Sequence, residues 1–405
     1  MKKYTLLLLI IVLIKTTVLS QGCLPYGITF TTQEEIDNFQ NDYTGCTEIE
    51  GGVWISQTDI TNLNGLNTIT SIGEYLIISG NIALTSLAGL NNLSTIGEYL
   101  AIGYNNELID LTGLNNLVTI NGYLEIIGNS SLTNLSGLDN LTTIEGYFRI
   151  SENNLLTYLT GLESLTTIGG ELDIYSNLAL LNLVGLSNLT SIGERLFIGC
   201  ENDDISALTT LTGLFNLTTI GWDVTILSNS SLIDLEGLNN LTFIGGSLTI
   251  DNNHVLSSIE GITNIDAASI INNLGIRRNP LLSTCEVNSV CDYLANPNGY
   301  ISIFDNAPGC NSKEEIEEAC FVSVHGYDSK PVFTIYPNPA KNKLFLSSEN
   351  IETINKVTIY NQLGQEVLNK NKITSSIDIS MLESGMYIIE LYSDIVIIRE
   401  KFIVE

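Results

Sequence analysis

The chain has 405 residues, 44% of them hydrophobic and 15% charged, with 16 Lys and Arg against 45 Asp and Glu and a net charge of -29. This balance excludes sequence-independent nucleic-acid binding, which needs clustered basic side chains, and makes an anionic membrane surface a poor partner. The apolar content argues against disorder, and the length predicts two or three domains.

Residues 1–20 are predicted to be a signal peptide. The pair Lys2-Lys3 precedes an apolar run over residues 6–14, and Val18-x-Ser20 offers a cleavage site. The run is shorter than the ~20 apolar residues of a membrane span. A lipoprotein anchored at Cys23 is an alternative, but the usual leucine before the cysteine is absent. We therefore expect an exported chain with no membrane span in its mature form.

Residues 21–50 are predicted to form an N-terminal cap. Cys23 and Cys46 flank this segment, and export makes disulfides possible. Between them, Thr32-x-x-Glu35 has the pattern of a capping box, which predicts a short helix through Phe39.

A repeat of 24 residues fills the chain from residue 51 to residue 282. A Leu-x-Ile-x-x-Asn signature, as in Leu76-x-Ile78-x-x-Asn81, and a Gly-Leu pair share this period, and one interval is 28 residues long. The glycines of the pair are Gly65, Gly89, Gly113, Gly137, Gly161, Gly185, Gly213 and Gly237. A period in this range indicates a solenoid.

The residue pattern within one turn of the repeat predicts the structure of that turn. Its apolar positions lie mostly two or three residues apart, which favours short strands joined by corners over an amphipathic helix. The recurring asparagine is expected to stack on itself, with its amide bonding the backbone of adjacent turns. Asn-Leu-Thr at 140, 188, 216 and 240 falls on the same period, so we interpret these sites as structural and not as glycosylation acceptors.

A second cap is predicted at residues 283–321. We expect helices from Ser283 to about Leu294 and from Ser312 to near Cys320, each opened by a Ser-x-x-Glu pattern. The four cysteines of this cap are Cys285, Cys291, Cys310 and Cys320. They allow three connectivities, of which Cys285–Cys310 with Cys291–Cys320 is one. A zinc site is disfavoured because the cluster contains no histidine and no CxxC.

The repeat between paired-cysteine caps resembles the receptor L domain and its leucine-rich-repeat relatives, over about residues 23–320. This resemblance implies a mainly β fold: a β-solenoid of ~24-residue turns with short helical disulfide caps.

The C-terminal segment has a different pattern. After a linker at residues 322–331, residues 332–405 contain alternating β-branched and aromatic runs, which predict a small antiparallel β-sandwich. Tyr336-Pro-Asn-Pro339, Asn361-Gln-Leu-Gly364 and Ser384-Gly-Met-Tyr387 resemble motifs of the type A sorting domain of the type IX secretion system. The resemblance implies that this segment engages the secretion machinery and directs translocation across the outer membrane. A secreted or outer cell-surface location follows, with possible removal of the domain afterwards.

The sequence offers little for catalysis. The two histidines, His254 and His325, lie in different regions, which leaves little for a catalytic triad or a histidine metal site. We expect no catalytic residue, no metal and no cofactor. Glu125 and Asp173, at equivalent positions of predicted strands two turns apart, are a weak candidate pair for glycoside hydrolysis. Asp203-Asp204 is a weak candidate for calcium binding. We interpret both as surface acids.

A binding face is the remaining candidate. Strand residues alternate, so those beside the buried Leu and Ile point outward. The predicted ligand-binding residues are Tyr75, Tyr99, Tyr123, Tyr147, Arg149, Tyr175 and Phe197. Aromatic rows of this kind supply contact area at low entropic cost. The alternative is that the tyrosines stack only to stabilise the sheet.

The expected function is therefore that of a non-catalytic, adhesin-like protein that recognises an extracellular protein or polysaccharide. Two alternatives stay open: a structural surface-coat protein without a ligand, and a carboxylate-dependent glycoside hydrolase.

Overall fold

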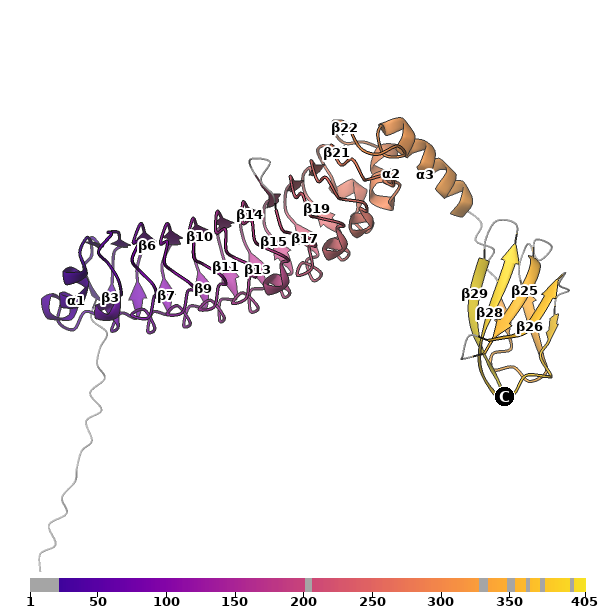
Figure 1. Cartoon of the computed structure of the whole chain (residues 1–405), viewed down its shortest axis with the longest axis horizontal. Helices are drawn as coiled ribbons and strands as arrows, with labels where there is room; N and C mark the ends of the chain where they lie inside the picture. Colours follow the sequence, from indigo (N-terminus) through magenta and orange to yellow (C-terminus); the bar gives the residue numbers. More distant parts are fainter. Residues whose placement is uncertain are drawn as a thin grey trace, which may run out of the picture. The chain divides into compact units, whose positions relative to one another are not determined.

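The computed structural model describes residues 22–200, 206–327, 334–347, 354–361, 365–371, 376–393 and 397–405. They fall into two compact units, Met1–Cys320 and Phe321–Glu405, each with its own hydrophobic core (Figure 1). The predicted signal peptide, residues 1–20, and the acidic pair Asp203-Asp204 lie outside the described residues. Among the described residues, no helix is long and apolar enough to cross a membrane.

The first unit is a solenoid built on two parallel sheets, and its successive turns can be followed in Figure 1. The larger, twelve-stranded sheet contains β2 (Ile28–Phe30), β4 (Val53–Ile55), β6 (Leu76–Ser79), β8 (Leu100–Gly103), β10 (Leu124–Ile127), β12 (Phe148–Ser151), β14 (Leu172–Tyr175), β16 (Leu196–Gly199), β18 (Val224–Leu227), β20 (Leu248–Asp251), β21 (Leu274–Arg277) and β22 (Ile301–Phe304). In most pairs of the repeat, a residue lies beside the one 24 places later, as Leu76 lies beside Leu100.

The second, ten-stranded sheet has strands of two residues each. They are β1 (Gly22–Cys23), β3 (Glu48–Ile49), β5 (Ser71–Ile72), β7 (Thr95–Ile96), β9 (Thr119–Ile120), β11 (Thr143–Ile144), β13 (Thr167–Ile168), β15 (Ser191–Ile192), β17 (Thr219–Ile220) and β19 (Phe243–Ile244). Short 3-10 helices are η1 (Asn64–Leu66), η2 (Val184–Leu186), η3 (Glu236–Leu238), η4 (Glu260–Ile262) and η5 (Ala267–Ser269). The predicted β-solenoid is confirmed.

Each turn buries its apolar positions between the two sheets. In the turn that begins at Leu76, all the predicted apolar side chains through Ile96 are at most 1% exposed. The glycine of the Gly-Leu pair is required by close packing of successive turns. A Cβ on Gly89 would lie 1.8 Å from the carbonyl oxygen of Leu63, so no other residue fits without moving the backbone.

The repeated asparagine forms the predicted ladder. The Oδ1 atom of Asn153 accepts the backbone N–H of Asn129 at 3.0 Å, and its Nδ2 atom donates to the carbonyl of Ile126 at 2.8 Å. The ladder consists of Asn81, Asn105, Asn129, Asn153, Asn177, Asn229, Asn253, Asn279 and Asn306, all buried. Each carboxamide donates to a carbonyl of the preceding turn.

A second, exposed asparagine ladder contains the four Asn-Leu-Thr sites. The Nδ2 atom of Asn140 donates to the carbonyl of Asn115 at 2.7 Å, and the Thr142 hydroxyl donates to the carbonyl of Val118 at 3.1 Å. Asn188, Asn216 and Asn240 repeat this contact in later turns. Both polar residues of the motif therefore have the structural role that the repeat predicts.

The N-terminal cap has the predicted helix and disulfide. Helix α1 (Gln33–Asp42) follows a capping box in which Thr32 and Glu35 each accept from the other's backbone N–H. Phe39 of this helix is fully buried, and Cys23 is bonded to Cys46.

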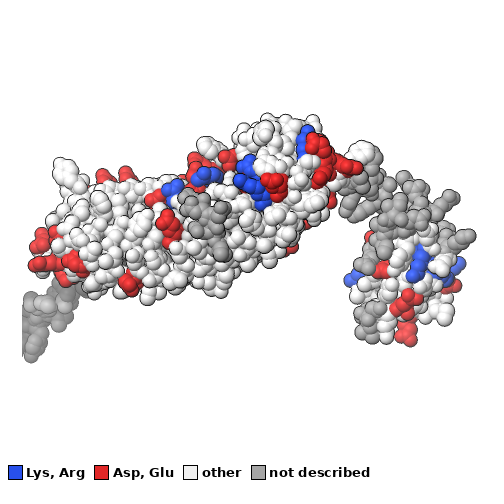
Figure 2. All heavy atoms as spheres, turned by 45° about the horizontal axis from the view of Figure 1, so that its top comes forward, with Lys and Arg blue, Asp and Glu red and all other residues white. Residues whose placement is uncertain are grey.

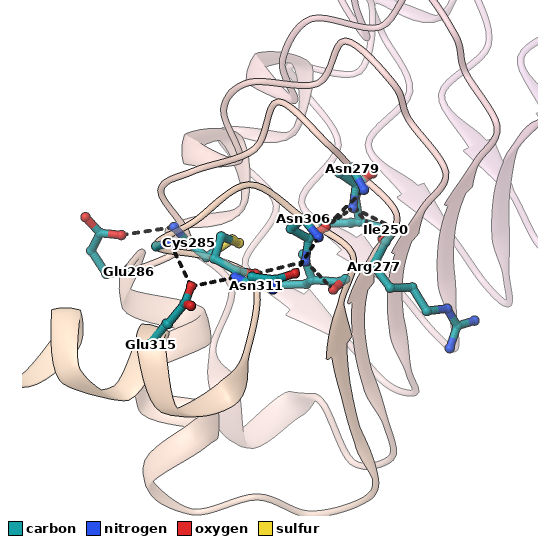
Figure 3. Close-up of a disulfide and its surroundings, with 11 residues drawn as sticks. Ile250, Arg277, Asn279, Cys285, Glu286, Asn306, Asn311 and Glu315 are labelled. Atoms are coloured by element: carbon teal, nitrogen blue, oxygen red, sulfur yellow. Dashed lines mark hydrogen bonds between the residues drawn. A yellow bond between two sulfur atoms is a disulfide. The ribbon is translucent and has the colours of Figure 1, made fainter.

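The C-terminal cap contains α2 (Asn288–Ala295) and α3 (Lys313–Tyr327). Its disulfides join Cys285 to Cys310 and Cys291 to Cys320, which is one of the three connectivities that the sequence allows. The predicted helix start at Ser283 is wrong. The carboxylate of Glu286 accepts the backbone N–H of Cys285 at 3.0 Å (Figure 3), so it does not close a box on Ser283, and α2 begins at Asn288.

Helix α3 begins as predicted but ends later. Ser312 caps it by accepting the backbone N–H of Glu315 at 3.2 Å. The predicted end near Cys320 is wrong, because no glycine or proline interrupts residues 313–325. Residues 322–327 of the predicted linker 322–331 are therefore helical.

The second unit is an antiparallel sandwich, as predicted. One sheet contains β23 (Thr334–Tyr336), β24 (Lys343–Ser347) and β27 (Ser376–Asp378), and the other contains β25 (Ile354–Tyr360), β26 (Glu366–Asn371), β28 (Gly385–Ser393) and β29 (Ile397–Val404). A shared core joins the sheets. Asn338 of the Tyr-Pro-Asn-Pro motif bonds to the backbone of β29, donating to Lys401 at 3.2 Å and accepting from Ile403 at 2.9 Å.

Candidate functional site on the strand face

The seven predicted binding residues lie together on the outer side of the twelve-stranded sheet. We call this outer side the strand face. The four tyrosines each precede a strand, from β6 to β12, and Arg149, Tyr175 and Phe197 lie within β12, β14 and β16. In-register parallel pairing places residues 24 apart on neighbouring strands, so the repeat itself assembles this surface.

The four tyrosines form a continuous stack. Ring centroids from Tyr75 to Tyr99, Tyr99 to Tyr123 and Tyr123 to Tyr147 lie 5.2, 4.2 and 4.5 Å apart, with interplanar angles of 15°, 11° and 5°. The rings therefore cover one another's faces and are half-buried, which is the stacking that the sequence left open as an alternative. The stack therefore exposes ring edges and hydroxyl groups more than ring faces.

Gly52 adjoins one end of the stack and Arg149 adjoins the other. A Cβ on Gly52 would lie 2.5 Å from the ring of Tyr75, so the absent side chain makes room for the first ring. At the other end, the guanidinium carbon of Arg149 lies 5.2 Å from the centroid of Tyr147. This cation–π contact adds stability to the stack.

The hydroxyls of Tyr123 and Tyr147 resist ionisation. Burial is the main cause that raises the pKa of Tyr123, and a hydrogen bond with Tyr99 adds to it. Burial also raises the pKa of Tyr147, whose hydroxyl donates to Oε1 of Glu125 at 2.9 Å. Tyr123 and Tyr147 therefore stay neutral well above neutral pH.

This shift predicts a loss of stability in alkali. An unfolded tyrosine has a pKa of about 10. Because the folded pKa values of Tyr123 and Tyr147 are higher, the stability that these two residues contribute is complete below pH ~10 and is lost as the pH rises beyond it. Urea denaturation between pH 9 and pH 12 should show this fall. It should be smaller in a Tyr123→Phe, Tyr147→Phe double variant; an equally steep fall would assign the effect to other groups.

A chain of ion pairs continues the strand face beyond the tyrosines. Arg149 lies 3.1 Å from Glu125 and 3.4 Å from Asp173, and Arg195 lies 2.9 Å from Asp173 and 3.0 Å from Glu171. The side chain of Asp173 is only 3% exposed and contacts both arginines. The sequence analysis did not identify this chain, although opposite charges 22 and 24 residues apart are the signal for it.

Two aromatic rings adjoin these charges. Tyr175 and Phe197 meet edge to face, with centroids 6.0 Å apart. The guanidinium of Arg195 lies 5.6 Å from the centroid of Phe197. Unlike the stacked tyrosines, these two rings are not parallel, and both are half-buried.

A second ion-pair cluster lies nearer the C-terminal cap. Asp251, at the end of β20, accepts hydrogen bonds from Arg277 at 2.8 Å and from Nε of Arg278 at 2.7 Å. Burial opposes ionisation of this carboxyl, but the two arginines outweigh it and hold the pKa of Asp251 below its usual range. Neither Arg277 nor Arg278 is among the residues predicted to bind a ligand.

Basic residues of the solenoid occur only here. Between residues 22 and 312 the sequence contains no lysine and four arginines, Arg149, Arg195, Arg277 and Arg278. All four belong to these two clusters. Figure 2 shows blue patches bordered by red on this side of the solenoid, against a mostly uncharged surface.

The other surfaces of the solenoid are weaker candidates for a binding site than the strand face. A shallow groove of about 440 Å³ on the ten-stranded sheet is lined mainly by glycines and by the hydroxyls of Thr143, Thr167, Ser191 and Thr219. Within the described residues, no group of three or more His, Cys, Asp or Glu could hold a metal ion. His254 is exposed in a turn.

Family comparisons match a part of each unit. Residues 45–99 match the receptor L domain family, and residues 334–405 match the secretion system C-terminal sorting domain family. No curated protein matches the chain. The sorting domain directs secretion through the type IX system, which fits a secreted or cell-surface protein, and the receptor L domain is typical of binding proteins at such surfaces. The chain therefore carries a receptor L domain in its solenoid and ends in a type IX secretion sorting domain.

Proposed function

We propose that the strand face binds an extracellular protein or glycan and does not transform it. The observation that carries the proposal is the composition of this face: stacked tyrosines, the Tyr175–Phe197 pair and four arginines in ion pairs lie on one sheet. Aromatic side chains and arginine are the residues most enriched at the centres of binding sites.

The geometry supports tight binding because the side chains are already ordered. The tyrosines hold one another by stacking, and Arg149 and Arg195 are each fixed by two carboxylates. A ligand that contacts ordered side chains pays less of the ordering entropy that weakens association.

The same contacts favour a non-catalytic role over the hydrolase alternative. A glycosidase needs space between its two carboxyl groups for the scissile bond and, in inverting enzymes, a water. Here the guanidinium of Arg149 contacts both Glu125 and Asp173. It occupies the space in which a substrate would have to react.

Changes to the Tyr175–Phe197 pair test the proposal. Replacing Tyr175 and Phe197 with alanine should weaken retention on arrays of extracellular proteins and polysaccharides by about tenfold or more. Stability should change little, because both side chains are half-buried on the surface. Trp222→Ala with Phe243→Ala is a matched control, since these aromatics are 57% and 45% exposed and lie at β17 and β19 of the other sheet.

Retention that is unchanged, or that is reduced equally by the control pair, would contradict the assignment of the strand face. Filament growth by the full chain without any retained ligand would favour the surface-coat alternative.

A further inference from the structure

The N-terminal end of the strand face carries an exposed tryptophan within an uncharged row of side chains. Trp54 lies in the middle of β4 and is 45% exposed. In-register pairing places it between Thr29 of β2 and Ile77 of β6, and Ala101 of β8 follows Ile77 in the same row. The strand neighbours of Trp54, Ile77 and Ala101 are all buried, so these three side chains point away from the core.

The tyrosine stack borders this row. Tyr75 lies two residues before Ile77, and Tyr99 lies two residues before Ala101, so these rings are on the same side of the sheet as the row. The two ring centroids are 5.2 Å apart. We call the five residues Trp54, Tyr75, Ile77, Tyr99 and Ala101 the Trp54 patch.

The Trp54 patch is contiguous and contains no charge. Neighbouring strands lie about 4.8 Å apart, so side chains at paired positions of β4, β6 and β8 are direct neighbours. The first charged side chain of the row is Glu125, which lies beside Ala101 one turn later. Apolar side chains that are exposed together, and not singly, are typical of sites that contact a partner.

Acidic side chains border the patch. Glu74 and Glu98 directly precede the two tyrosines and are exposed, and the backbone N–H of Glu98 donates to the carbonyl of Glu74 at 2.8 Å. Residues 22–148 contain 14 acidic residues and no lysine, arginine or histidine. In Figure 2 the N-terminal part of the solenoid accordingly shows red and white and no blue. This part of the surface therefore attracts a positively charged partner and repels an anionic one.

We propose that the Trp54 patch docks a protein whose contact surface has an apolar centre and a basic rim. This inference rests on the proposed binding role of the strand face, and it selects a protein over a glycan. Tryptophan and tyrosine are enriched at the centres of protein interfaces, and lysine or arginine at the partner's rim would meet Glu74 and Glu98. A neutral glycan gains nothing from these charges, and an acidic glycan is repelled by them.

The test measures the binding of three synthetic peptides to the full chain by fluorescence anisotropy at one ionic strength. The first peptide has a centre of leucine and tryptophan flanked by lysines. The second replaces its lysines with glutamates, and the third replaces its apolar centre with serines. The first should bind about tenfold or more tightly than either of the others, because only it matches both the patch and its acidic border.

Changes in the patch locate this binding. Trp54→Ala should weaken binding of the lysine-flanked peptide about tenfold, to the level of the serine-centred peptide. Ala101→Arg should have the same effect, because it places bulk and positive charge within the patch. Glu74→Gln with Glu98→Gln should instead narrow the difference between the lysine-flanked and glutamate-flanked peptides by about threefold, as expected for exposed charge pairs.

Trp222→Ala is the matched control. This tryptophan is 57% exposed and follows β17 of the other sheet, so its removal should leave all three affinities unchanged. Circular dichroism should show that each variant keeps the fold, because the changed side chains lie on the surface.

The proposal is overturned if the three peptides bind alike, or if the preference for the first survives both Trp54→Ala and Ala101→Arg. A preference that Trp222→Ala removes as strongly as Trp54→Ala would place the contact elsewhere and would also overturn it. Binding of neutral oligosaccharides that is lost with Trp54→Ala, in the absence of peptide binding, would overturn the assignment to a protein.

The two proposals fail in distinguishable ways. Retention on the arrays that is lost with Tyr175 and Phe197, while the three peptides bind alike, removes only the Trp54 proposal. Retention and peptide binding that ignore every change on the strand face remove both.

Discussion

Replacing Asn153 with alanine should destabilise the solenoid by about 4 kcal/mol, a large part of the stability of an ordinary domain. Asn153 is fully buried in the middle of the asparagine ladder. Its carboxamide accepts from Asn129 and donates to the carbonyls of Ile126 and Ser151. Alanine removes all of these bonds without removing the backbone groups at the other end.

The cost comes mainly from the groups left behind. The backbone N–H of Asn129 would be buried without its acceptor, at about 1–3 kcal/mol, and the carbonyls of Ile126 and Ser151 would each lose one accepted hydrogen bond. No water is expected to replace the carboxamide, because the site is packed within the core. In a solenoid each turn is stabilised by its neighbours, so the defect weakens contacts between turns on both sides of Asn153.

The exposed ladder supplies a matched control. Asn140 belongs to the same region and donates to the carbonyl of Asn115 at 2.7 Å, but it is exposed. Asn140→Ala should cost only about 0.5–1 kcal/mol, because water can solvate the freed carbonyl. Urea denaturation of both variants, followed by circular dichroism, measures the difference. Equal costs would mean that the buried ladder contributes no more than the exposed one.

The sequence predicts this ladder because the cause is local and repeated. An asparagine at the same corner of every turn can direct its amide toward the backbone of the preceding turn. The same reasoning predicts the buried Leu and Ile positions and the glycine at Gly89. Repetition strengthens a weak single-residue signal, because the same residue type recurs at the same position in successive turns.

Contacts made by only one or two turns were harder to predict. Arg149 and Asp173 are single departures from the repeat, and their pairing follows only when residues 24 apart are placed side by side. The tyrosines were predicted as an exposed row, but parallel strands lie about 4.8 Å apart, close to the distance at which rings stack. The sequence pattern alone does not say whether their faces meet a ligand or one another.

The start of α2 was mispredicted for a different reason. The pattern from Ser283 to Glu286 fits a capping box, but a pattern does not determine which N–H a carboxylate will accept. In the structure Glu286 accepts from Cys285, next to the disulfide to Cys310. The disulfides of the cap thus constrain the backbone in a way that the spacing of helix signals does not reveal.

Replacing Phe402 with alanine should unfold the sorting domain and stop secretion while leaving the solenoid folded. Phe402 is fully buried in the last strand, β29, and its ring lies 5.7 Å from that of Tyr387. Removing a buried phenylalanine costs about 3–5 kcal/mol. A domain of about 70 residues has only about 4–10 kcal/mol to lose.

The two units should respond separately, because their cores share no residue. Calorimetry of Phe402→Ala should show the loss or a large downward shift of one transition and no change in the other. In the producing cell, immunoblotting should find the variant retained and absent from the medium and outer surface. Phe345→Ala is the matched control: this ring is 39% exposed, so the fold and export should survive. Export lost with Phe345 but not with Phe402 would mean that the machinery reads a surface around β24 and not the folded sandwich.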